Sequence, residues 1–125
     1  MDDPFVITVH VKERIIEVKY PPRPTEATFT QYDREVRAAI EKLGAPWDCL
    51  VDQSAFSAFA PELTPKIAEL NRWAAGKGMR RTTRVVASSA IGELQSARVL
   101  RDGGVSGIAT IFHTRAEAWA ALTKK

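Results

Sequence analysis

The chain has 125 residues, 45% of them hydrophobic and 26% charged, and a formal net charge of +3. This length is that of one domain with one core, and the composition is that of an ordinary soluble globular protein. The apolar runs are too short to span a membrane, and the acidic start (MDDP), with no apolar segment after it, argues against a secretory signal.

Two segments at the start of the chain predict an antiparallel hairpin. In residues 5–12 and 14–20, apolar and polar side chains alternate, as in strands with one buried face. On the first segment, the apolar face carries Phe5, Ile7, Val9 and Val11. The gap between the two segments is short, and prolines at positions 21, 22 and 24 end the sheet because proline cannot donate to a strand ladder.

A long helix is predicted after these prolines. Thr28 suits the N-cap position, and Gln31 stands three residues later, as in a capping box. Apolar side chains recur at helical spacing as far as Leu43, and Gly44 is a natural stop. The compact apolar run that follows, residues 47–53, predicts a buried strand.

Helices and strands alternate through the rest of the chain. We expect a helix over 64–76, a strand over 84–88, a helix over 91–101, a strand over 108–112 and a helix over 114–122. Spacing in the helix over 91–101 places Ile91, Leu94 and Ala97 or Arg98 on one side. Thr114 and Glu117 form a capping box at the start of the last helix.

This order predicts a single α/β domain over residues 1–125. An N-terminal β-hairpin is followed by alternating strands and helices, which gives a mixed sheet of about five strands with four helices. The later strands should be parallel with right-handed crossovers. Function in such sheets usually lies at the carboxyl ends of the strands, which here means the residues after Asp52.

The element order and two segments of sequence resemble the STAS domain and its SpoIIAA-like relatives. Residues 49–54 (CLVDQS) look like the family's central strand, an apolar run followed by Asp, any residue and Ser. Residues 111–122 look like its last strand and helix. The family includes bacterial anti-sigma-factor antagonists and cytoplasmic domains of sulphate transporters. The resemblance implies a non-enzymatic, cytoplasmic regulatory domain, and the presence of only one cysteine, Cys49, fits a reducing compartment.

The chain departs from the antagonists at their phosphorylation segment. These relatives carry an Asp-Ser-Ser/Thr-Gly type sequence shortly after the central strand, and a kinase phosphorylates a serine there. The corresponding residues 60–63 are Ala-Pro-Glu-Leu, without serine or glycine. Ser54, Ser57 or Thr64 could substitute, although Thr64 also suits the N-cap of the next helix. Glu62 could imitate a phosphorylated state or be an ordinary first-turn charge.

Two functions from different classes follow. In the first, the surface after the central strand binds a protein partner through Asp52, Ser54, Ser57, Glu62 and Thr64. In the alternative, the domain binds an apolar or anionic small molecule, with Phe56 and Phe59 lining the mouth of its site. A third possibility is that the same apolar loop mediates formation of a homodimer.

A local positive field adds a candidate anion site. No acidic residue occurs from Leu70 to Gly92, a stretch with five basic residues. Arg80, Arg81 and Arg84 could meet an anionic headgroup or an acidic partner, or they could be a solvated loop and helix end.

Other chemistries find little support in the sequence, which predicts no cofactor and no metal. His10, His113 and Cys49 are separated by whole elements and lack paired ligand spacing. The Gly-Lys-Gly at 76–78 follows a helix and lacks the rest of a phosphate-loop motif. Ser88-Ser89 ends a strand but has no nucleophile-elbow sequence around it. Nucleic acid is not expected, since the tryptophans occupy core spacing and do not interleave with the basic residues.

Overall fold

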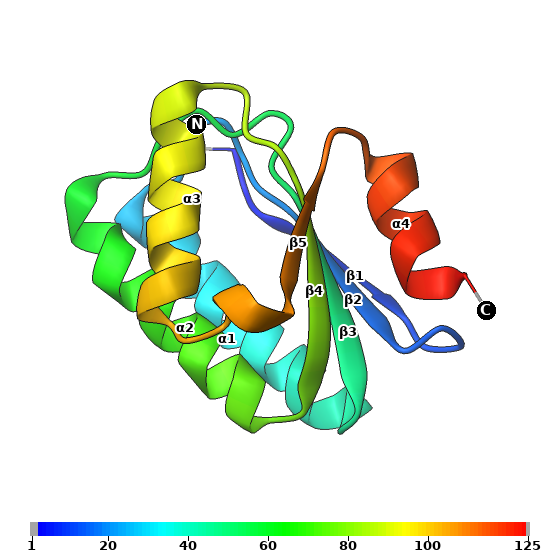
Figure 1. The fold of residues 1–125 in the computed structure, drawn as a ribbon. Coiled ribbons are helices and arrows are strands. Elements are labelled where there is room, and N and C mark those ends of the chain that lie inside the picture. The colour runs from blue at the N-terminus through cyan, green and yellow to red at the C-terminus, as the bar shows by residue number, and fades with distance from the viewer. Residues whose placement is uncertain (1–2, 125) are drawn as a thin grey trace.

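A computed structural model describes residues 3–124 as a five-stranded sheet with helices on both faces (Figure 1). The strands are β1 (Val6–His10), β2 (Ile15–Lys19), β3 (Trp47–Asp52), β4 (Met79–Val85) and β5 (Ala109–Phe112). The helices are α1 (Glu26–Leu43), α2 (Thr64–Gly76), α3 (Ala90–Asp102) and α4 (Arg115–Thr123), with short 3-10 turns at Pro61–Leu63 and Ser106–Ile108.

The strands lie in the sheet in the same order as in the chain. β1 and β2 are antiparallel, and every later pairing is parallel. Because right-handed crossovers between successive parallel neighbours all return on the same side, α1, α2 and α3 cover one face, and α4 covers the other (Figure 1). The predicted α/β fold, with its N-terminal hairpin and mixed sheet, is therefore confirmed.

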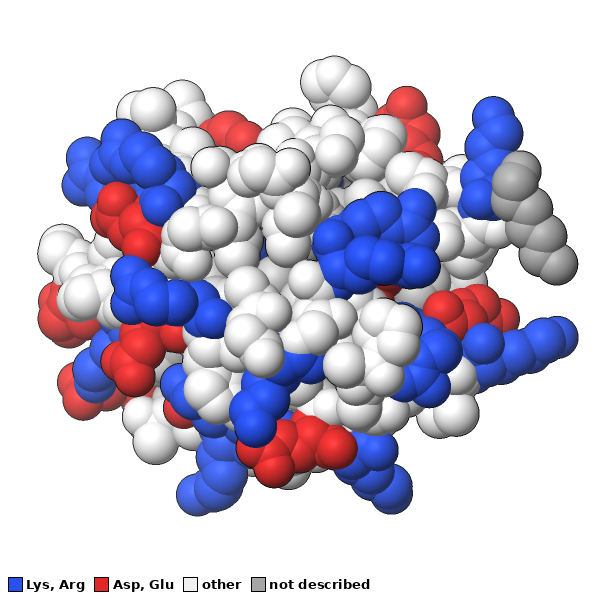
Figure 2. All heavy atoms as spheres, turned by 60° about the horizontal axis from the view of Figure 1, so that its bottom comes forward, with Lys and Arg blue, Asp and Glu red and all other residues white. Residues whose placement is uncertain are grey.

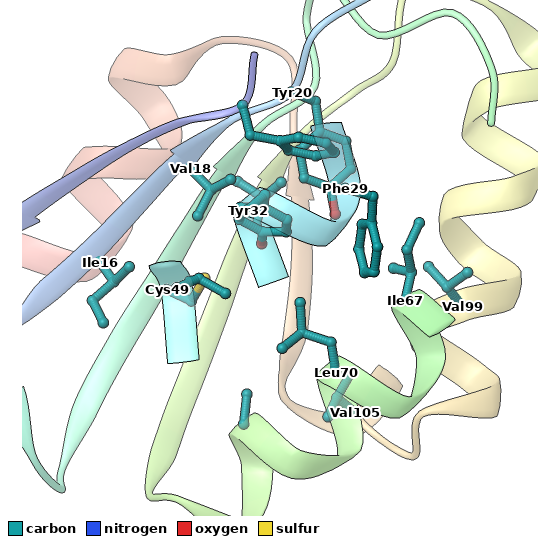
Figure 3. Close-up of a cluster of buried hydrophobic side chains, with 14 of the residues drawn as sticks. Ile16, Val18, Tyr20, Phe29, Tyr32, Cys49, Ile67, Leu70, Val99 and Val105 are labelled. Atoms are coloured by element: carbon teal, nitrogen blue, oxygen red, sulfur yellow. The ribbon is translucent and has the colours of Figure 1, made fainter. Parts of the chain in front are cut away.

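Strand alternation divides the buried side chains between two cores. Along β3, Trp47, Cys49 and Val51 face the large core under α1–α3, part of which Figure 3 shows. Leu50 faces the smaller core under α4, together with Ile15, Val85, Ala118 and Leu122. β3 is thus buried on both faces, which explains its nearly continuous apolar sequence. Among residues 3–124, no helix combines the length and apolar character needed to cross a bilayer.

Two element starts differ from the sequence prediction by more than one residue. Helix α1 begins at Glu26, because Thr25 is the N-cap and Thr28 occupies the third position of the same capping box. Strand β4 begins at Met79, five residues before the predicted start at 84. Its first half is basic and polar, and a register shift opposite Trp47 breaks the simple alternation, so the sequence pattern hides it.

The apolar side predicted for α3 is wrong. Ile91 and Leu94 are 65% and 72% exposed. The buried residues of this helix are Gly92, Ser96, Val99 and Leu100. Small residues face inward because the loop after β3 packs directly on the helix: a Cβ at Gly92 would lie 2.4 Å from the Ser57 carbonyl oxygen.

The apolar face predicted for the first strand is only partly buried. Phe5 belongs to the core and stacks on Tyr32, with 4.2 Å between ring centroids. Val11, at the tip of the hairpin, is 68% exposed. Val9 and Val11 line a surface groove beside Leu43 at the end of α1.

Candidate functional site

The loop after β3 begins with a tight local turn at the sheet edge. The Ser54 amide donates a 2.9 Å hydrogen bond to the Asp52 carboxylate, which fixes the direction in which the chain leaves the strand. Ser54 is exposed, and Asp52 is partly buried. The predicted residues Ser57 and Glu62 follow, the first partly buried and the second exposed.

Phe56 and Phe59 do not line the mouth of a ligand site. They are 0% and 4% exposed, and their ring centroids lie 4.3 Å apart. Tyr20 packs edge-on against Phe56 at 5.6 Å. The loop is apolar because these rings fill the end of the large core, so the phenylalanine-lined ligand mouth predicted from the sequence is wrong.

Gln95 of helix α3 and the two serines that precede the helix hold the loop by hydrogen bonds. The Ser89 hydroxyl donates to the Ser57 carbonyl at 2.5 Å, and the Ser88 hydroxyl donates to the Phe56 carbonyl at 2.6 Å. The Gln95 side-chain amide both accepts from the Phe59 amide and donates to its carbonyl. Sequence reasoning missed this role of Gln95 and the serines, because nothing in their spacing shows a contact with residues more than 30 positions away.

Helix α3, on which this loop packs, also carries a pair of exposed apolar side chains. Ile91 and Leu94 lie three residues apart on the outer side of α3, adjacent in sequence to Gly92 and Gln95, which contact the loop. The strand-end surface, as we name it, consists of Ser54, Ser57, Glu62, Ile91 and Leu94. It combines hydroxyls and one carboxylate with two large aliphatic side chains, and the loop is hydrogen-bonded to Ser89 and Gln95.

Thr64 is not a side-chain cap for α2. Leu63 occupies the N-cap position, and none of the side chains described forms a capping hydrogen bond to the first turn. The turn at Pro61–Leu63 leads directly into the helix, and Pro65 supplies the proline of its first turn. Thr64 is partly buried, and because it begins α2 and does not belong to the loop, we do not include it in the strand-end surface.

Arg80, Arg81 and Arg84 do not form one anion site. Arg80 and Arg81 both bind the buried Asp48 carboxylate, at 2.9 and 2.8 Å. Burial raises the pKa of Asp48, but hydrogen bonds from the two arginines outweigh burial and hold it below the ordinary value. Arg84 is 1% exposed and lies in the large core, away from both.

The distribution of charged side chains on one face of residues 3–124 also gives no sign of a large anion site. On the face shown in Figure 2, basic side chains are scattered and several lie next to acidic ones, without forming a continuous basic area. The local positive field inferred from the sequence is therefore partly neutralised by Asp48, which comes from the neighbouring strand.

The histidines and the cysteine occupy separate environments. His10 contacts Glu17 at 2.9 Å, and Arg115 binds the same carboxylate at 2.7 Å, which ties α4 to the hairpin. His113 is exposed at the end of β5. Burial raises the pKa of the Cys49 thiol, so this thiol is a poor nucleophile. Within residues 3–124, no three His, Cys, Asp or Glu side chains gather as a metal site would require.

Comparison with known proteins gives no assignment. No protein-family model matches the chain, and no curated protein matches it either.

Proposed function

We propose that this chain is a non-enzymatic, cytoplasmic regulatory domain that binds a protein partner through the strand-end surface. The proposal rests on the resemblance of the sequence to STAS domains and on one observation, the exposure of Ile91 and Leu94. Fully burying an aliphatic side chain of this size contributes about 1.5–3 kcal/mol, so a partner that covers the pair gains a substantial hydrophobic contribution.

The support under the pair favours recognition of a protein. The loop is held by the Ser88, Ser89 and Gln95 hydrogen bonds, so little conformational freedom would be lost on binding. The loop packs on α3 at Gly92, next to Ile91 in the chain, so a partner that covers the apolar pair would also meet polar loop residues, and protein interfaces usually mix apolar and polar contacts in this way. The small-molecule alternative loses its main support because Phe56 and Phe59 are buried.

The test places a photo-crosslinking amino acid at position 94 and, as a matched control, at the equally exposed Val11 on the hairpin. We expect a crosslinked protein partner in living cells from position 94 and none from position 11. The double variant Ile91→Asp/Leu94→Asp should abolish copurification of that partner, whereas Val11→Asp should preserve it.

Folding and self-association must be measured in the same variants. Circular dichroism should show the native spectrum for both, since the substituted side chains are exposed. Analytical ultracentrifugation shows whether the crosslinked partner is a second copy of the chain. Equal recovery of the partner by the double variant and the wild type would refute the proposal.

A further inference from the structure

Within residues 3–124, the large core contains a buried cation that has no anionic partner. Arg84 is 1% exposed, and its guanidinium makes no ion pair with any carboxylate in residues 3–124. Its hydrogen bonds go to neutral oxygens, from Nε to the Thr82 hydroxyl at 3.2 Å and from Nη2 to the Asn71 amide oxygen at 3.4 Å, and the Tyr20 hydroxyl also interacts with the guanidinium. Within the described part of the chain, Nη1 is buried and has no hydrogen-bond partner.

Such an arrangement is unfavourable as it stands. Transferring a charged group from water to a protein interior costs several kcal/mol unless an opposite charge and hydrogen bonds compensate for the lost hydration. An unpaired buried donor adds a further cost. A domain of this size is only marginally stable, so a second component that neutralises the cation would have a large effect.

A small cavity lies at this guanidinium. Its volume is about 20 Å³, and its lining includes Arg84, Asn71, Tyr20, Tyr32 and Cys49. Figure 3 shows Tyr20, Tyr32 and Cys49 in the layer between the sheet and helices α1 and α2. A cavity of about 10–15 Å³ already accepts one water-sized occupant, so this one has room for a single small ion and excludes a sulfate or phosphate group.

Among the described residues that line the cavity, the polar neighbours of Arg84 carry no negative charge. Burial raises the pKa of Tyr20 and of Cys49, and it raises the pKa of Tyr32 more strongly. All three groups are therefore protonated at neutral pH and can donate hydrogen bonds. A site with one guanidinium and several neutral donors complements one negative charge.

We propose that the cavity at Arg84 binds one small monovalent anion of the halide class, which acts as the counterion of the buried guanidinium. The site is internal and separate from the strand-end surface, so this proposal is independent of the proposed function. Bound only in the folded state, the anion would stabilise the domain by mass action.

The test measures unfolding of the wild type in sodium chloride and in sodium gluconate at equal sodium concentration. We expect the midpoint of unfolding to rise with chloride along a saturating curve, and gluconate, which is too large for the cavity, to have no such effect. Arg84→Met should reduce the chloride response at least tenfold. Arg98→Met, the same change at an exposed position, should retain it.

A second measurement uses only the wild type, in case Arg84→Met does not fold. Crystals grown with sodium bromide should give an anomalous peak within hydrogen-bond distance of Arg84 Nη1. A peak without a saturating gain in stability would mean binding at crystal concentration only, and a gain without a peak in this cavity would place the ion elsewhere. Either result overturns the proposal, as does equal stability in chloride and gluconate.

Discussion

Replacing Phe56 by alanine tests the central correction that the structure makes to the sequence prediction. The ring is 0% exposed and packs against Tyr20 and Phe59. It also lies next to Gly92, at the place where any other residue would carry a Cβ. Phe→Ala substitutions in cores cost about 3–5 kcal/mol, and aromatic pairs add about 0.5–1.5 kcal/mol beyond area burial. Because Phe56 loses both kinds of contact, we expect about 4–5 kcal/mol of destabilisation.

That loss is a large part of the stability of a domain of this size, about 5–15 kcal/mol. Urea denaturation, followed by circular dichroism, should show a much lower midpoint with an unchanged slope, because the surface exposed on unfolding is nearly the same. Val11→Ala, at a 68% exposed position, should change the free energy of unfolding by less than about 0.5 kcal/mol.

The refuting result is equally definite. A cost of less than about 1 kcal/mol for Phe56→Ala would mean that the ring is not packed in solution, since no buried phenylalanine is removed so cheaply. The phenylalanine-lined ligand mouth predicted from the sequence, and with it the small-molecule alternative, would then regain support.

Two further predictions concern packing and pH. Gly92→Ala would normally stabilise a helix by about 1 kcal/mol, but here it should lower the melting temperature, since its Cβ would overlap the Ser57 carbonyl; a higher melting temperature would contradict the packing of the loop on α3. Hydrogen bonding by Arg115 lowers the pKa of Glu17, and the pKa of Asp48 is also lowered. Both carboxylates therefore contribute stability that is present above their unfolded pKa values, about 4, and is lost as pH falls through the lower folded values. Chemical denaturation at a series of pH values should show this decline, and Glu17→Gln should flatten it; an unchanged profile would count against the Arg115 contact.

Much of the fold was predictable because it depends on patterns within short segments. Alternation in the hairpin, helical spacing before Gly44 and the Thr114–Glu117 capping box each act over a few residues. The largest boundary error lies where a polar sequence occupies a strand, over residues 79–83 of β4, since such a segment has no apolar periodicity.

The candidate site was predictable only in position. By itself, the sequence determined the α/β order and the loop after Asp52, because periodicity and chain order are local properties. The tertiary structure decided which side chains of that loop are available. It buried Phe56, exposed Leu94 and enclosed Arg84 apart from every carboxylate of residues 3–124, since burial and pairing depend on residues that folding brings together from distant parts of the chain.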